Sequence, residues 1–195
     1  MSGGLGRELG RKAFHMLSLV YLGFYLRFGR GRALEALAAW ALVVWAVERT
    51  RLSRPELNAS LLRLFRGIHR PEEAQRISGI LWTTLGCWLT IAALGAGPRY
   101  VEAALLMQAF GDATAALAGK AFGRRVFRFR GKTKSLEGTL ACLAVCLACA
   151  RGAGFAWGPA LAAASAASAV ELAAPPPDDN LWLPLTASLV LALLA

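Results

Sequence analysis

Seven apolar stretches, separated by charged or Gly/Pro-rich breaks, constrain the fold of this chain more than any other feature. Long apolar runs without alternation favour helices. With 56% hydrophobic residues and a mean hydropathy of +0.47, the 195-residue chain is more apolar than ordinary soluble domains of this size. We predict one domain, residues 1–195, that is an all-α polytopic integral membrane bundle of about seven transmembrane helices. The stretches lie near 13–28, 33–47, 77–94, 100–119, 138–150, 155–173 and 181–194.

The positive charges are unevenly distributed along the chain, whose formal net charge is +10. Most lysines and arginines lie in the N-terminal segment and in two connections, 48–76 and 120–134, which the positive-inside rule places in the cytoplasm. We expect a multi-pass protein of the bacterial cytoplasmic membrane, surrounded by membrane lipids, with its active site on the cytoplasmic side and no nucleic-acid partner. Within the connection 48–76, apolar residues recur at helical spacing and predict a short helix on the cytoplasmic membrane surface. These residues are Leu57, Leu61, Leu62, Leu64 and Phe65. The helix would be either a simple connector or a gate for the substrate.

Asp112 most needs an explanation, because it lies within an apolar stretch. An ionisable side chain inside a membrane is costly and therefore marks a candidate functional site. A basic loop follows it, with Lys120, Arg124, Arg125, Arg128, Arg130, Lys132 and Lys134. A carboxylate beside such a basic loop predicts a metal ion bound next to phosphate groups. Ser135 and the backbone amide of Gly138 are expected to donate hydrogen bonds to these phosphates.

A second acidic site lies at Glu171, Asp178, Asp179 and Asn180. Their hard oxygen atoms suit Mg²⁺, which commonly binds together with nucleotide phosphates, and Asp112 would complete the protein ligands. The alternative is that Asp178, Asp179 and Asn180 only cap the last helix. Three cysteines at helical spacing, Cys142, Cys146 and Cys149, are interpreted as packing residues rather than as a metal site.

Four polar residues near the N-terminus share one helical face by their spacing: Glu8, Arg11, Lys12 and His15. A lone histidine in an apolar helix is more often a packing residue. However, this end of the helix is predicted on the same side as the other two sites, so His15 stays a candidate.

Five segments together resemble the polyprenol kinase family, which includes dolichol kinase, phytol kinase and CTP-dependent diacylglycerol kinase. They are ELGRKAFH at 8–15, LNASLLRLFR at 57–66, GDATAALAGKAFG at 111–123, KTKSLEG at 132–138, and EL at 171–172 followed by DDNLWLPL at 178–185. They come in family order and span nearly the whole chain. Similar elements occur in the phosphatidate cytidylyltransferases, but this chain is shorter and has D-D-N in place of their C-terminal signature, which favours the kinase.

The resemblance implies transfer of the γ-phosphate of CTP, with Mg²⁺, to the hydroxyl of a membrane lipid alcohol such as phytol, geranylgeraniol, a polyprenol or diacylglycerol. It implies metal ligands at Asp112, Asp179 and Asn180, with the proton acceptor left open among Asp112, Asp178 and His15. Nucleotide contacts are expected at Lys120, Arg124, Lys132, Lys134, Ser135, Glu137 and Gly138, and lipid-substrate contacts at Arg11, Lys12 and Glu171. A homodimer is compatible with this interpretation. The alternatives are a cytidylyltransferase that makes a CDP-lipid and an ion-coupled membrane transporter.

Overall fold

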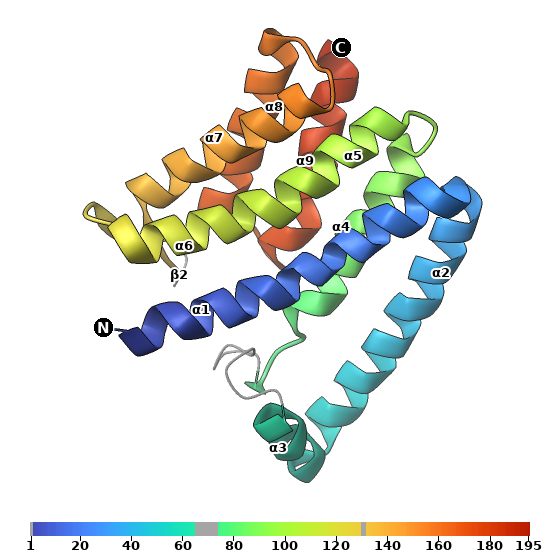
Figure 1. The fold of residues 1–195 in the computed structure, drawn as a ribbon. Coiled ribbons are helices and arrows are strands. Elements are labelled where there is room, and N and C mark those ends of the chain that lie inside the picture. The colour runs from blue at the N-terminus through green and yellow to red at the C-terminus, as the bar shows by residue number, and fades with distance from the viewer. Residues whose placement is uncertain (1, 65–73, 130–131) are drawn as a thin grey trace.

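The computed structural model describes residues 2–64, 74–129 and 132–195, which form a bundle of helices with one short hairpin (Figure 1). The helices are α1 (Ser2–His15), η1 (Met16–Ser18), α2 (Leu19–Ser53), α3 (Pro55–Leu64), α4 (Gly79–Leu94), α5 (Pro98–Leu106), η3 (Met107–Gly111), α6 (Asp112–Phe122), α7 (Leu136–Gly152), α8 (Trp157–Ala173) and α9 (Asp179–Leu194). Strands β1 (Val126–Phe129) and β2 (Lys132–Ser135) pair antiparallel, with Val126 opposite Ser135.

The helices from α4 onwards follow the predicted apolar stretches, whereas α1 lies mostly before the first stretch and α2 covers parts of the first two. The break predicted after residue 28 appears as a kink inside α2, where Gly29 has a φ of 79° that other residues adopt with difficulty. A helix, α3, forms in the segment for which the membrane-surface helix was predicted, and none of its side chains is buried. Phe65 and Arg130, which belonged to the predicted surface helix and basic loop, lie outside the described residues.

The prediction of a polytopic membrane bundle is wrong. Among the described residues, no helix combines the length and the apolar character that crossing a membrane requires. Helices α4 and α9 have 16 residues each, while α7 and α8 have 17 each. The 35 residues of α2 include charged side chains on both sides of the kink, with Arg27 before it and Arg30 and Glu48 after it. The predicted multi-pass location in a bacterial cytoplasmic membrane is contradicted by the same finding.

Small side chains account for much of the apolar composition that suggested a membrane protein. Helix α8 packs against α7 and α9, and α9 also packs against α4 and α5. The largest group of buried residues contains nine alanines, among them Ala160, Ala164 and Ala167 of α8, all with no exposed surface. Cys142 and Cys146 of α7 belong to the same group and face Gly111, which fits their interpretation as packing residues.

Helices α5, η3 and α6 follow one another without a break, so residues 98–122 run as one long rod beside α1 (Figure 1). The middle of the rod, Met107–Gly111, is a π-helix that ends immediately before Asp112. Such π-turns are rare and occur often at functional sites. The arrangement brings the polar face of α1 against Asp112.

The close approach of α6 and α7 gives a first prediction. A Cβ atom on Gly138 would lie 2.6 Å from the carbonyl oxygen of Ala115, which is closer than real Cβ contacts allow. We expect Gly138→Ala to lower the free energy of unfolding by about 1–3 kcal/mol, because the two backbones must move apart. Urea denaturation measures this change. Gly152→Ala in the same helix is the matched control, since no atom lies within 4 Å of its added Cβ; an equal loss in both variants would contradict the prediction.

Candidate metal and phosphate site

Three buried carboxylates meet at the centre of the molecule: Asp112, Glu171 and Asp179. Asp112 begins α6, Glu171 lies in the last turn of α8, and Asp179 begins α9. One oxygen from each lies within 4.8 Å of the others, a spacing that one metal ion can bridge. We call these three residues the acid triad.

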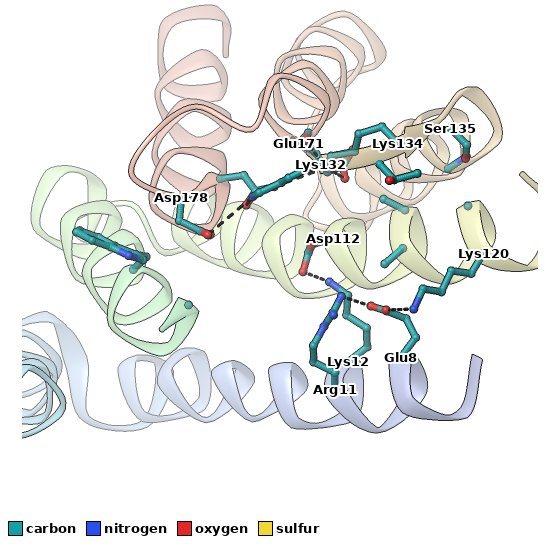
Figure 2. A pocket seen from close by; sticks show the side chains of 18 of the residues that line it. Glu8, Arg11, Lys12, Asp112, Lys120, Lys132, Lys134, Ser135, Glu171 and Asp178 are labelled. Carbon is teal, nitrogen blue, oxygen red and sulfur yellow. Dashed lines mark hydrogen bonds and ion pairs between the residues drawn. The ribbon is translucent and has the colours of Figure 1, made fainter. Parts of the chain in front are cut away.

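Lysines from two other parts of the chain neutralise the acid triad. Lys12 of α1 pairs with Asp112, and Lys134 of β2 pairs with Glu171. Lys132 Nζ lies 3.1 Å from Asp179 Oδ1 and 3.9 Å from Asp178 Oδ2. In Figure 2, Asp112 lies between Lys12 of α1 on one side and Lys132, Lys134 and Glu171 on the other.

The pKa values of the acids show the balance between burial and these lysines. Burial raises the pKa of Glu171, although Lys134 opposes the change. Burial and the neighbouring charge of Asp179 raise the pKa of Asp178 to about 6. Burial also favours the neutral form of Asp179, but Lys132 and Lys134 outweigh it, so the pKa of Asp179 is lowered. The charged state of the site therefore depends on its cations.

Helix α1 contributes its whole polar face to the site. Glu8 is buried and pairs with both Arg11 and Lys120, as Figure 2 shows. His15 Nε2 lies 3.6 Å from Asp112 Oδ2 and, among the described residues, this buried atom has no hydrogen-bond partner. Burial lowers the pKa of His15, so its imidazole is neutral near pH 7.

A cavity of about 1060 Å³ opens over the acid triad. Charged side chains of α1 and the hairpin line it together with apolar ones such as Ile77 and Trp82. Ser135 caps α7, accepting a hydrogen bond from the amide of Gly138 at 3.1 Å. The predicted site residues that line this cavity are Arg11, Lys12, Asp112, Lys120, Lys132, Lys134, Ser135, Gly138, Glu171, Asp178 and Asp179.

A second cavity of about 570 Å³ meets the first at Asp112. Its far walls are apolar side chains of η1 and α2, including Leu17, Val43 and Val47, whereas His15 and Asn180 line its polar end. Arg11, Lys12, Gly79, Asp112 and Asp178 line both cavities. Of the acid triad, Asp112 lines both cavities, whereas Glu171 and Asp179 line the larger one.

Some predicted site residues are placed elsewhere. Asn180 donates a 2.7 Å hydrogen bond from its side chain to Asp178, which caps α9, so the acid triad holds Glu171 in the place predicted for Asn180. The lining of the larger cavity, within the part of the chain that the structure describes, does not include Arg124 or Glu137. Glu137 instead accepts hydrogen bonds from the backbone of Arg125, at 3.2 and 3.4 Å.

Sequence reasoning missed Gln108. Its side chain donates to the carbonyl oxygen of Asn180 at 3.0 Å and accepts from the thiol of Cys87 at 3.2 Å, so it ties the π-helix to the start of α9 and to α4. It is 1% exposed. An amide four residues before Asp112 in an otherwise apolar stretch was the available signal.

Comparison with protein-family models, with curated proteins and with solved structures gave no match. The resemblance to the polyprenol kinases therefore depends on its five segments alone. The geometry of the site has to support the function by itself.

Proposed function

We propose that this chain is a Mg²⁺-dependent phosphotransferase that moves the γ-phosphate of a nucleoside triphosphate, CTP by resemblance, to the hydroxyl of an alcohol with a long apolar tail. One observation carries the proposal. Three buried carboxylates, each with an oxygen within 4.8 Å of the others, line a lysine-rich cavity, and one of them, Asp112, also lines a largely apolar cavity. Metal, phosphate and acceptor would thus meet at Asp112.

The donor set of the acid triad fits a hard divalent cation. All three side chains offer carboxylate oxygen, the ligand type that Mg²⁺ prefers, and each is less than 10% exposed. The orphaned Nε2 of His15 beside Asp112 supports a site built for a further polar group. Asp112, Glu171 and Asp179 would hold the ion, and a bound Mg²⁺ would supply charge neutralisation on the phosphate oxygens.

The larger cavity supports binding of a triphosphate. Lys132 and Lys134 enter it from β2, and Lys120 enters it from α6. Lysine binds phosphate as a point charge on a flexible stem, so these side chains can follow the phosphate oxygens. Phosphoryl transfer asks a protein mainly for this positioning and charge neutralisation.

The smaller cavity supports an acceptor with an apolar tail. Tyr21, Trp40 and Val44 line it away from the site, so a hydrocarbon chain placed there would direct its hydroxyl towards Asp112. His15 lines the end near Asp112, and its neutral Nε2 would take the proton of the hydroxyl. The acceptor oxygen would form a bond to the γ-phosphorus as the bond from that phosphorus to the β–γ bridging oxygen breaks, and the nucleoside diphosphate would leave.

A label-transfer assay tests the proposal. The purified protein is incubated with Mg²⁺, an apolar alcohol (phytol, a polyprenol or diacylglycerol, dispersed in detergent) and CTP labelled at either the α or the γ phosphate. We expect label from the γ position in the alcohol and none from the α position. Label from the α position would replace the kinase with nucleotidyl transfer, and the absence of label from every alcohol would remove the proposed function.

A further inference from the structure

Each carboxylate of the acid triad, which a metal ion would use as a ligand, is paired with a lysine. Lys12 Nζ occupies Asp112 Oδ2, and Lys134 Nζ occupies Glu171 Oε1. Lys134 Nζ also lies 2.6 Å from the carbonyl oxygen of Glu171 and 3.7 Å from Asp179 Oδ2. The lysines and a metal ion would therefore compete for the same three carboxylates.

Burial makes a positive partner necessary for these carboxylates whenever no metal ion is bound. Buried charges are stable only when they are paired, and three carboxylates so close together repel one another. The side chains of Lys12 and Lys134 are 4% and 12% exposed. Water therefore has little access to solvate either ammonium group if it loses its carboxylate partner. A divalent cation that entered alone would leave two ammonium groups without their carboxylates in the same cavity.

A triphosphate supplies what those two ammonium groups would then lack. Both lysines line the larger cavity, and the flexible stem of a lysine lets its Nζ move from one acceptor to another. Phosphate oxygens are strong acceptors for ammonium groups. When metal and nucleotide are bound together, the carboxylates pair with the metal and the lysines pair with the phosphates. Every charge in the site then has a partner, which neither ligand achieves alone.

We propose, resting on the proposed function, that Lys12 and Lys134 are exchangeable counter-ions. Without metal and nucleotide they would neutralise the acid triad; when both bind, they would release the carboxylates to the metal and pair with the phosphates. Each ligand alone binds weakly, and each strengthens the binding of the other by the same factor. The exchange therefore disfavours binding of a metal ion when no nucleotide is bound.

Direct binding of Mn²⁺, used in place of Mg²⁺, tests the exchange without any turnover. Free Mn²⁺ is measured by electron paramagnetic resonance, with and without a β,γ-methylene analogue of CTP. In the wild-type protein we expect the analogue to tighten Mn²⁺ binding by about tenfold or more. In Lys134→Met and Lys12→Met we expect Mn²⁺ alone to bind about tenfold tighter than in wild type, and the analogue to add less than about threefold.

Lys120→Met is the matched control, because Lys120 lines the same cavity and forms an ion pair with Glu8 of α1. It is expected to weaken binding of the analogue and to leave both the affinity for Mn²⁺ alone and the coupling unchanged. If a buried variant does not fold by circular dichroism, Lys132→Met replaces it; this side chain is 32% exposed and pairs with Asp179, so a smaller tightening is expected.

The outcomes separate the two proposals. If the analogue tightens Mn²⁺ binding to the wild type but the lysine variants bind Mn²⁺ alone no more tightly, the counter-ion exchange is wrong and the proposed function stands. If the wild type binds no Mn²⁺ with or without the analogue, the proposed function fails, and the exchange fails with it.

Discussion

Asp112→Asn is expected to lower the rate of γ-phosphate transfer by about a thousandfold, which corresponds to a loss of about 4 kcal/mol of transition-state stabilisation. The amide keeps the size of the side chain but removes a negative charge from the acid triad and from the ion pair with Lys12. Asp112 is also the member of the acid triad that lines both cavities. The label-transfer assay with CTP labelled at the γ position measures the loss.

Two variants show whether such a loss is specific. Glu56→Gln removes an exposed carboxylate from α3, remote from the acid triad, and is expected to keep full activity. Asp112→Glu keeps the charge but moves the carboxylate by one methylene, so we expect partial activity. If Asp112→Asn folds and keeps more than about a tenth of the wild-type rate, Asp112 does not take part in the reaction.

The positions of several helices could be predicted from the sequence because local signals bound or interrupt them. Pro98 starts α5, Asp178 caps α9, and Gly29 marks the kink in α2. The membrane interpretation failed because composition counts apolar residues without asking what they pack against. Here many of them are alanines such as Ala160 and Ala163, which are buried where α8 meets its neighbouring helices.

The site was partly predictable for a different reason. A carboxylate in an apolar stretch has few explanations, so Asp112 and Glu171 were identifiable as candidates before any contact was known. Their partners were not, because the ion pair between Lys12 and Asp112 joins residues 100 positions apart. Asn180 was predicted as a metal ligand because its side chain offers an oxygen atom. In the structure that side chain instead donates a hydrogen bond to Asp178 at the start of α9. Residue spacing does not show which of these two roles a side chain takes.

Arg51→Met is expected to cause the largest loss of stability among the single variants considered, about 3–5 kcal/mol in the free energy of unfolding. Arg51 is 3% exposed and binds both oxygens of Glu48, at 3.0 and 2.6 Å. It also donates to Asn58 at 2.9 Å and to the carbonyl oxygen of Arg76 at 2.7 Å. Removing its guanidinium leaves the carboxylate of Glu48, 5% exposed, without its cation. The midpoint of urea denaturation reports the loss.

The same ion pair connects the end of α2 to the start of α4, because Glu48 accepts a 2.8 Å hydrogen bond from the amide of Ser78, the residue before α4. If the penalty comes from the unpaired carboxylate, Glu48→Gln combined with Arg51→Met will cost less than the sum of the two single variants. Arg49→Met, an exposed position on the same helix, controls for loss of positive charge and is expected to change stability by less than about 0.5 kcal/mol. Additive effects of the pair would show that Arg51 stabilises the fold mainly through Asn58 and Arg76 rather than through Glu48.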